Sequence, residues 1–285
     1  MIATPKDATM LPQDREFTFG PRDFERVRTL IYQHAGIHLH EGKQAMVYSR
    51  LSRRLRETQH TSFDSYLKWL EASTGDHGAR EWQEFVNSLT TNLTSFFRED
   101  HHFQILAEQL KNHGSKPLRI WCCAASTGEE PYSIAMTVAE NLGLHASVKI
   151  LSSDIDTNVL AKASRGVYEE NARGLSPARL RNFFLKGKGN NAGAIRVKPE
   201  LARMVEFKPF NLMNTAWSLG EPFDYVFCRN VMIYFDKPTQ YQVLSRMVPV
   251  LADDGLFFAG HSESFFHAGD LIESCGRTIY RKAQR

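Results

Sequence analysis

The segment Leu118–Ala135, with the sequence LRIWCCAASTGEEPYSIA, constrains the fold of this chain more than any other segment. Its first six residues form a short apolar run of the kind that a buried parallel strand needs. Small residues and Gly128 follow, where the backbone can turn sharply and a ligand can approach it closely. Glu129, Glu130 and Pro131 then suit the first turn of a helix. A strand, a glycine-bearing turn and a helix in this order are typical of open α/β sheets that bind nucleotide-like ligands.

Apolar runs and helical periodicity alternate from about residue 99 onward. The predicted strands are 118–123, 148–153, 223–228 and 255–260, and residues 277–281 are expected to add an edge strand. The predicted helices are 99–111, 131–142, 158–164 and 238–251. Strands separated by helices predict an α/β fold with a mostly parallel sheet that is covered by helices on both faces.

The first ninety residues show only helical periodicity. Residues 1–20 are polar, contain two prolines and have no period, so we expect a loose leader there. The predicted helices are 23–36, 42–58, 63–72 and 81–89. A chain of 285 residues is long enough for two domains. We therefore expect a helical domain over 21–90, followed by the α/β domain over 91–285.

The segment 186–208 interrupts the alternation of strands and helices. It begins with a turn-forming run at Gly187–Asn191, and residues 195–198 and 204–208 then alternate apolar and charged side chains. This alternation predicts a solvent-facing antiparallel pair. We expect a small inserted β subdomain with an exposed edge that could accept another strand.

Composition limits the class of protein. The chain has 35 Lys and Arg and 32 Asp and Glu, so its net charge of +3 does not argue for nucleic acid. Its four cysteines form no CxxC pair, which favours free thiols in a reducing cytosol. No apolar run reaches the length of about 18 residues that spans a membrane, and the start lacks the apolar core of a secretory signal. We expect a cytoplasmic protein without membrane insertion, and the spacing of His, Cys and Asp predicts no metal site.

Polar residues follow the predicted strands, where open α/β sheets bind ligands. The turn before Glu129 lacks the glycine patterns of dinucleotide and phosphate loops, and acids at a helix start favour a cationic ligand. Asp154 ends the second strand and is suited to hold ribose hydroxyls, although it or Asp156 could instead cap the next helix. Asn211 follows another predicted strand edge, where it could pair with a purine or simply form a turn.

Two further stretches carry candidate site residues. In TTNLTSFFRE, Arg98 could close a site between domains or form a surface ion pair with Glu99 or Asp100. In CRNVMIYF, Tyr234 belongs either to the site or to the core. A catalytic His261–Glu263 pair is conceivable, but a structural or positioning role for these residues is favoured.

Five motifs occur in a recognisable order: TTNLTSFFRE, ASTGEEPYSIA, SSDID, FDYVFCRNVMIYF and AGHSE. With this order and spacing, the chain resembles the CheR family of chemoreceptor glutamate methyltransferases from about residue 20 to residue 281. The resemblance implies a Rossmann-like class I S-adenosylmethionine-dependent methyltransferase fold, with an N-terminal all-α domain and a small inserted antiparallel β subdomain. Cys122 and Cys123 stand where the family usually has small residues, and we expect only a change in packing.

The resemblance also implies a reaction and its site. The methyl group of S-adenosyl-L-methionine would pass to glutamate side chains of membrane chemoreceptors, leaving S-adenosyl-L-homocysteine. Asp154 would hold the ribose, Glu129 would face polar groups of the cofactor, and Arg98 and Tyr234 would orient the reactants as catalytic residues. The implied cofactor contacts as a whole are Asn92, Thr94, Arg98, Glu129, Asp154, Asn211, Leu212, Arg229 and Asn230.

The implied partners are the cytoplasmic domains of methyl-accepting chemotaxis receptors in membrane arrays. Relatives bind a receptor's C-terminal tail peptide by strand addition to the β subdomain, and Gly187, Gly189 and Arg196 fall where that contact would be made. One predicted helix carries Arg50, Arg53, Arg54 and Arg56, which could steer acidic receptor helices or form an ordinary solvated face. We expect a monomer, since nothing in the sequence indicates an obligate dimer.

Two other classes of function remain as alternatives. The first is an S-adenosylmethionine-dependent methyltransferase of another protein or of nucleic acid, acting through the basic helical domain. The low net charge and the lack of basic surface interleaved with aromatic residues disfavour a nucleic-acid substrate. The second is a non-catalytic adaptor that keeps the cofactor fold as a ligand sensor.

Overall fold

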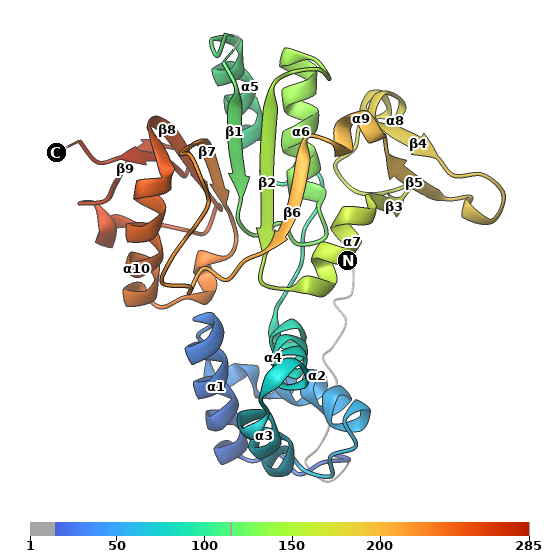
Figure 1. Cartoon of the computed structure of the whole chain (residues 1–285), viewed down its shortest axis with the longest axis vertical. Helices are drawn as coiled ribbons and strands as arrows, with labels where there is room; N and C mark the ends of the chain where they lie inside the picture. Colours follow the sequence, from blue (N-terminus) through green and yellow to red (C-terminus); the bar gives the residue numbers. More distant parts are fainter. Residues whose placement is uncertain (1–14, 115, 285) are drawn as a thin grey trace, which may run out of the picture. The chain divides into compact units, whose positions relative to one another are not determined.

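The computed structural model describes residues 15–114 and 116–284, which form two compact units (Figure 1). Unit 1 contains the described residues up to Gln33 together with Leu39–Leu89, and unit 2 contains His34–His38 and the chain from Thr90 onward. Most of the expected leader, residues 1–14, lies outside the described residues. Among the described residues, none of the helices has the length and apolar character needed to cross a bilayer.

Unit 1 is helical, as the sequence predicts. A 3₁₀ turn, η2 (Glu41–Lys43), precedes α2, and the four α-helices are α1 (Pro21–Ala35), α2 (Gln44–Glu57), α3 (Phe63–Ala72) and α4 (Gly75–Leu89). Ser62 caps α3 by accepting a hydrogen bond from the Ser65 N–H at 3.1 Å. The start of α4 was predicted too late because its first turn, GDHG, consists of weak helix formers.

Residues 15–20 do not form a loose leader, so that prediction is wrong for the described part of the segment. Phe17 is buried, and its ring lies edge-on to Phe63 with 6.4 Å between centroids. Phe19 packs on the same ring with 4.5 Å between centroids. The buried Phe17 and the half-buried Phe19 hold this stretch against the helical core, because each removes apolar surface from water.

Unit 2 contains a seven-stranded sheet with the order β6-β2-β1-β7-β8-β10-β9. Five of its strands are parallel: β1 (Leu118–Cys122), β2 (Val148–Asp154), β6 (Val205–Pro209), β7 (Phe223–Cys228) and β8 (Leu251–Ala259). The last two, β9 (Ile272–Gly276) and β10 (Ile279–Lys282), are antiparallel to their neighbours. The mostly parallel sheet is therefore confirmed, but β10 pairs on both sides and β9, which was not predicted, forms the edge.

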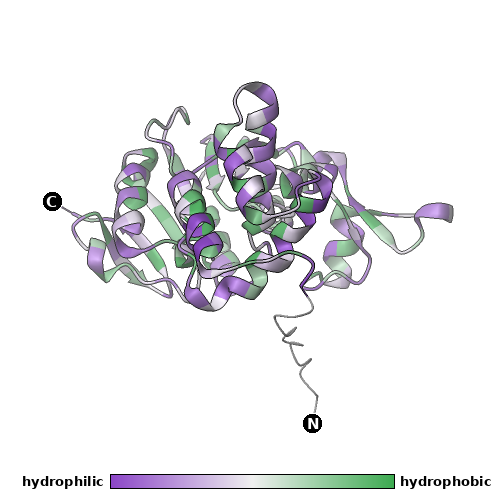
Figure 2. Ribbon diagram, turned by 90° about the horizontal axis from the view of Figure 1, so that it is seen from below, coloured by the Kyte–Doolittle hydropathy of each residue, from purple (hydrophilic) through white to green (hydrophobic). Residues whose placement is uncertain are grey.

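Helices bury both faces of this sheet, as its near-continuous apolar strands require. Alternate residues of β1 enter different clusters: Ile120 packs with α5 (His101–Lys111) and α6 (Glu129–Leu142), and Trp121 packs with α10 (Lys237–Met247). Beyond β2, α7 (Thr157–Arg165) contacts β6. Figure 2 shows strands dominated by hydrophobic residues and helices that carry both kinds.

A second, antiparallel sheet has the order β3-β5-β4, with β3 (Val167–Glu169), β4 (Phe184–Lys186) and β5 (Ala194–Val197). The helix α8 (Pro177–Phe183) precedes β4, and α9 (Pro199–Ala202) leads from β5 to β6. The expected pairing of 195–198 with 204–208 is wrong, because β6 joins the large sheet parallel to β2. β6 is the edge strand of that sheet and is partly exposed. Its sequence therefore shows the same alternation of apolar and charged residues as a solvent-facing hairpin would.

Candidate active site

The strand order places a topological switch point between β1 and β7. The chain runs outward from β1 to β2 and β6, and then returns to the other side of β1 to form β7 and β8. Ligands of open α/β sheets bind outside the carboxyl ends of the strands at such a point. The motifs that follow β1, β2, β6, β7 and β8 are brought to this one edge because these strands are parallel.

The turn after β1 is tightly bound to its surroundings. Gly128 has φ +98°, and a Cβ atom there would lie 2.6 Å from the Tyr168 hydroxyl and 2.9 Å from the Ala163 Cβ. Ser126 has φ +48°, an uncommon value for a residue with a side chain, and its N–H donates to Asp154 Oδ2 at 2.8 Å. The glycine is thus required by close packing, and the end of β2 holds the turn.

Asp154 is almost fully buried at the end of β2. Its second oxygen, Oδ1, accepts the Asp156 N–H at 2.9 Å, and burial raises the pKa of the carboxyl to about 6. The carboxylate also accepts a backbone hydrogen bond from Ile155, and its two oxygens together keep an acceptor position that suits a ribose hydroxyl. Asp156 takes the capping role, since its Oδ1 accepts the N–H groups of Asn158 at 2.9 Å and Val159 at 3.2 Å.

Asn92, which was expected to touch the cofactor, makes contacts with two other turns of the protein. Its Nδ2 donates to Asp156 Oδ2 at 2.7 Å, and its carbonyl oxygen accepts from the Ser126 hydroxyl at 3.1 Å. These bonds fasten the TTNL stretch to the turns after β1 and β2. The side-chain amide oxygen of Asn92 remains an acceptor, and Thr94 lies half-buried in the same stretch.

Glu129 and Arg98 place opposite charges at this edge. Glu129 begins α6 and accepts from the Thr127 hydroxyl at 2.6 Å, and burial raises the pKa of its carboxyl. Arg98 donates through Nη1 to the carbonyl oxygen of Leu93 at 2.8 Å. Its guanidinium has further N–H donors. The ion pair with a neighbouring acid that the sequence suggested for Arg98 is replaced by this contact.

Arg229, expected to touch the cofactor, is instead the centre of a buried ion-pair network. Its fully buried guanidinium lies 3.2 Å from Glu99 Oε2 and 3.2 Å from Glu130 Oε2, and it also donates to the Arg98 carbonyl. Burial would raise the pKa of Glu99, but Arg229 and the hydrogen bonds from Asn230 and His261 together lower it. Burial raises the pKa of Glu130 despite the same cation.

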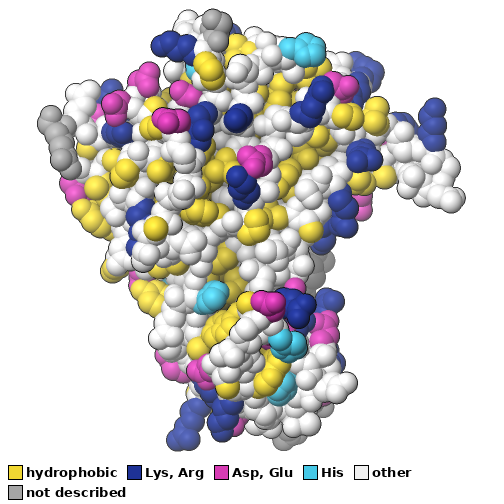
Figure 3. All heavy atoms as spheres, in the orientation of Figure 1, with side chains coloured by type: hydrophobic (Ala, Val, Ile, Leu, Met, Phe, Trp, Pro, Cys, Tyr) yellow, Lys and Arg dark blue, Asp and Glu magenta, His cyan; other side chains and the backbone are white. Residues whose placement is uncertain are grey.

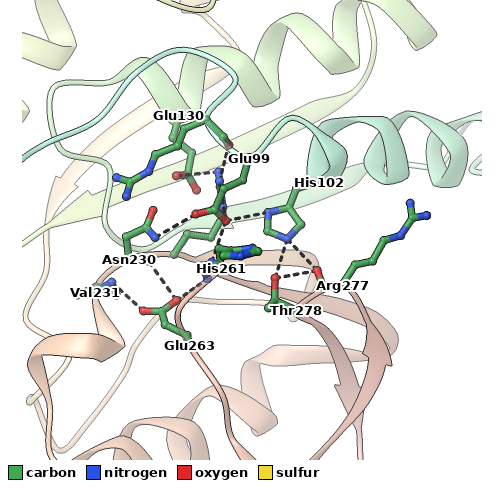
Figure 4. A network of polar contacts seen from close by, with 12 residues as sticks. Glu99, His102, Glu130, Asn230, Val231, His261, Glu263, Arg277 and Thr278 are labelled. Carbon is green, nitrogen blue, oxygen red and sulfur yellow. Dashed lines mark hydrogen bonds and ion pairs between the residues drawn. The ribbon is translucent and has the colours of Figure 1, made fainter. Parts of the chain in front are cut away.

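Asn230 follows in the left-handed conformation, with φ +59°. Its N–H donates to Glu263 Oε2 at 3.1 Å, and its Nδ2 donates to Glu99 Oε1 at 3.2 Å (Figure 4). The side chains of His261 and Glu263 do not form a pair. Glu263 is buried and accepts hydrogen bonds from backbone amides. His261 is exposed, and its backbone N–H donates to Glu99 Oε2 at 3.0 Å.

The residues expected near the adenine hold a short segment of unit 2. Asn211 donates through Nδ2 to the His34 carbonyl at 2.7 Å, and its Oδ1 accepts the Met213 N–H at 2.9 Å. The turn-forming alternative therefore describes its side chain. Leu212 is buried in the apolar cluster around Trp121.

Tyr234, the second expected catalytic residue, ends the 3₁₀ turn η4 (Met232–Tyr234). It is half-buried, and its carbonyl accepts the His38 N–H at 2.7 Å. Together with the bond from Asn211 to His34, this contact brings His34–His38 to the site edge. The helical periodicity of that region gave no sign of such a role.

The four arginines of α2 have different environments. Arg54 is largely buried and forms an ion pair with Glu81. Its Nε donates to Oε1 at 3.1 Å, and its Nη2 donates to Oε2 at 2.5 Å. Arg50 donates to the Leu89 carbonyl at 3.1 Å. Arg53 and Arg56 are exposed and pair with Glu57 and Glu16 at 2.9 and 2.7 Å. The expected basic face is thus reduced to two exposed arginines, since Arg54 is a core contact.

The small sheet presents the three residues expected at a tail-peptide site. Gly187 follows β4, and a Cβ atom there would lie 2.0 Å from the Asn191 carbonyl oxygen. Gly189 has φ +58° with open space around it. Arg196 is exposed on the central strand β5, opposite Val167 of β3 and Leu185 of β4.

Sequence reasoning did not predict the contacts of three carboxylates. It considered Glu99 only as a surface partner of Arg98, Glu263 only beside His261, and Glu130 only as an acid in the first turn of a helix. One signal pointed to Glu130, because the run EEPYSIAMTVA leaves few polar positions and an acid in a helix buried on all sides needs a partner. Glu99 and Glu263 stand in polar loops, where an acid gives no such signal. Both residues make their contacts with residues that are far away along the chain, and no local sequence pattern predicts such contacts.

Thiols and metal ligands add no further chemistry in the described chain. Cys122, Cys123 and Cys228 are buried free thiols, as expected for strand residues, and Cys275 is exposed. Burial raises the pKa of the Cys122 and Cys123 thiols well above the ordinary value. No group of three His, Cys, Asp or Glu side chains among residues 15–114 and 116–284 is arranged to hold a metal ion.

The groups at the carboxyl edge fit the implied cofactor. S-adenosylmethionine offers ribose hydroxyls, an ammonium group, a carboxylate and a positive sulfonium. The edge supplies carboxylate acceptors from the buried Asp154 and the half-buried Glu129 for the donors and the positive charge, and guanidinium donors from Arg98 for the carboxylate.

Comparison with known proteins gives the family. Residues 92–281 match the CheR methyltransferase SAM binding domain, and residues 22–90 match the CheR methyltransferase all-alpha domain. The chain is 52% identical over 276 residues to chemotaxis protein methyltransferase 2 of Pseudomonas aeruginosa, covering 95% of this chain and 96% of that protein. It is 48% identical over 273 residues to the chemotaxis protein methyltransferase of Escherichia coli, covering 95% and 94%. The chain belongs to the CheR methyltransferase family and is an S-adenosylmethionine-dependent methyltransferase.

Proposed function

We propose that this protein methylates glutamate side chains on the cytoplasmic domains of chemoreceptors. The observation that carries the proposal is the set of carboxylate and guanidinium groups at the carboxyl edge of β1, β2 and β7, in a chain whose relatives are named chemotaxis protein methyltransferases. Bound S-adenosylmethionine supplies an electrophilic methyl group on a positively charged sulfur. Asp154 holds the ribose hydroxyls of the cofactor, Glu129 faces its amino group, and Arg98 pairs with its carboxylate.

The acceptor needs no general base. A glutamate carboxyl has an ordinary pKa near 4.3, so it is already a nucleophile at neutral pH. Charge is lost as the carboxylate oxygen takes the methyl group, and a site that gripped the carboxylate strongly would stabilise the ground state more than the transition state. Arg98 and Tyr234 therefore orient the glutamate carboxylate in line with the bond between the methyl group and sulfur, and they exclude water. Thr94 lies nearby.

The small sheet tethers the receptor tail. In the antiparallel pair of β4 and β5, Leu185 lies opposite Arg196, and the Gly187 N–H bonds to the Ala194 carbonyl at 2.8 Å. The backbone groups of Phe184 and Lys186 then point to the open side of β4, where an extended peptide can add as a strand. The half-exposed Leu185 and Val167 flank Arg196 on one face, which suits a peptide with apolar and acidic side chains.

The exposed arginines of α2 steer the acidic receptor helices. Arg53 and Arg56 lie one helical turn apart, whereas Arg54 is occupied by Glu81. Figure 3 shows Lys and Arg interspersed with Asp and Glu over the visible face rather than in one broad basic patch. A local pair of arginines is suited to attract an acidic protein segment, and it does not resemble a nucleic-acid surface.

Transfer of labelled methyl from S-adenosylmethionine to receptor-enriched membranes tests the proposal. Label on receptor protein that is released by mild base indicates a methyl ester and supports it. Label on RNA would favour the nucleic-acid alternative, and an absence of label with normal cofactor binding would favour an adaptor. Arg98→Ala should abolish turnover, and normal turnover in that variant would remove Arg98 from its proposed role.

A further inference from the structure

The buried carboxylate of Glu263 and the half-buried carboxylate of Glu99 hold the loop after β7 from opposite sides (Figure 4). We infer that Glu99 and Glu263 are positioning residues, which together fix Asn230 in its left-handed conformation and thereby set the affinity for S-adenosylmethionine. The inference rests on the proposed placement of the cofactor at this edge. Neither residue needs to touch the cofactor, because each acts through the backbone and side chain of Asn230.

Glu263 holds the backbone of the loop. Its Oε1 accepts the N–H groups of Val231 at 3.0 Å and Met232 at 2.7 Å, and its Oε2 accepts those of Asn230 at 3.1 Å and Gly260. The side chain is almost fully buried, so these four amides could not find water in its place. A carboxylate is the group that accepts four hydrogen bonds through two oxygens.

Asn230 has a backbone conformation that is uncommon for a residue with a side chain. Asparagine adopts φ near +59° more readily than most such residues, but the conformation still has a cost that contacts with its surroundings can offset. The neighbouring loop after β8 approaches very closely: a Cβ atom on Gly260 would lie 2.4 Å from Asn230 Nδ2 and 2.7 Å from its backbone nitrogen. The two loops can meet only because residue 260 is a glycine and because Glu263 binds both of them.

Glu99 holds the side chain of the same residue. Its Oε1 accepts from Asn230 Nδ2 at 3.2 Å, and its Oε2 accepts from the His261 N–H at 3.0 Å. Glu99 is itself left-handed, with φ +57°, and its ion pair with the fully buried Arg229 keeps it charged. It therefore links the stretch that carries Arg98 to the loops after β7 and β8, and the three loops form one unit.

Glu263→Gln removes one hydrogen-bond acceptor and almost preserves the size of the side chain. The amide is almost the same size as the carboxylate, but its nitrogen cannot accept, so two backbone N–H groups would face another donor in a buried place. We expect the dissociation constant for S-adenosylmethionine to rise at least about tenfold. Glu263→Asp keeps both acceptor oxygens on a shorter side chain and should restore part of the affinity.

The test is calorimetric titration of the full-length variants with S-adenosylmethionine, with steady-state kinetics and thermal denaturation in parallel. Glu273→Gln is the control, because Glu273 is an exposed residue of β9 that pairs with Arg281. If Glu263 positions Asn230, the dissociation constant and the KM for the cofactor should both rise in Glu263→Gln. Both values should return part of the way in Glu263→Asp. A merely structural role predicts a lower melting temperature and kcat with an unchanged KM, and that result would overturn the inference.

Two further variants keep the inference separate from the proposed placement of the cofactor. If Asp154→Ala weakens binding and Glu263→Gln does not, the placement stands and the positioning role fails. If neither variant weakens binding, the placement itself is wrong. Should Glu263→Gln not fold, Glu99→Gln provides the second test: it keeps an acceptor for Asn230 but loses the charge, and unchanged cofactor affinity in it would count against the inference.

Discussion

Arg229 and Glu130 form an ion pair inside the protein, with 3.2 Å between Nη1 and Oε2 and exposed side-chain fractions of 0% and 9%. Glu99 shares the same cation at 3.2 Å. Burial raises the pKa of Glu130, whereas the cation and two hydrogen bonds lower that of Glu99. One arginine therefore holds a carboxylate of α6 and a carboxylate of the segment before α5 together.

Arg229→Met should destabilise the protein by about 3–5 kcal/mol at pH 7, because it leaves the buried Glu130 and the half-buried Glu99 without their cation. The loss should be smaller near pH 5, where those carboxylates can take up protons. Urea denaturation at both pH values measures this difference. Arg281→Met, which breaks a pair with more exposed partners, should cost less than about 1 kcal/mol. An equal loss for Arg229→Met at both pH values would contradict the electrostatic explanation.

His102 and Asp154 should affect the pH dependence of stability in opposite directions. Burial lowers the pKa of His102 to about 4 from 6.5, so the unfolded chain binds this proton more readily and acidification from pH 6.5 to 4 destabilises the fold. Burial raises the pKa of Asp154 to about 6 from 3.8, so the folded state holds that proton more tightly and acidification stabilises it.

Asp154→Asn should therefore lose stability more steeply on acidification than the parent protein, and His102→Gln less steeply. Melting temperatures between pH 4 and 7 measure both slopes. Changes of the same sign in the two variants would show that other groups dominate this range. Burial and the positive charge of Arg229 lower the pKa of His102, which explains why it stays uncharged so close to Glu99.

Arg54 and Arg53, neighbours on α2, should separate folding from receptor recognition. Arg54→Met removes the partner of the buried Glu81 and should cost about 3–5 kcal/mol in unfolding free energy. Arg53→Met breaks an exposed pair and should change stability by less than about 0.5 kcal/mol. Receptor methylation should fall in Arg53→Met and weaken with salt in the parent. A rate independent of salt would exclude steering by this pair.

Gly187 and Gly189 should respond differently to alanine. Gly187→Ala places a Cβ atom 2.0 Å from the Asn191 carbonyl, so the turn must distort and binding of a receptor tail peptide should drop at least tenfold. Gly189→Ala meets no atom within 4 Å and should cost about 1 kcal/mol from its left-handed backbone alone. Peptide binding by fluorescence anisotropy and the melting temperature distinguish the two effects. Normal peptide affinity in Gly187→Ala would place the tether elsewhere.

Elements with strong local patterns were predictable. The bounds predicted for Phe63–Ala72 and Phe223–Cys228 agree with α3 and β7, because helical spacing in one case and a continuous apolar run in the other fix the structure locally. The start of α4 and the pairing of β6 were missed. The first depends on tertiary support for weak helix formers, and an edge strand has the same alternation in either sheet.

The sequence by itself determined the order of strands and helices, the glycine turn after β1 and the motifs that mark the family, because these depend on residues adjacent along the chain. Only the tertiary structure decided which polar residues face one another. Asn92, Asn211 and Arg229 use protein partners between 64 and 177 positions away, and Arg54 turns inward to Glu81. For the buried Arg229 and the largely buried Arg54 such a pairing is required, since a polar group removed from water must find its partner wherever the fold brings one within reach.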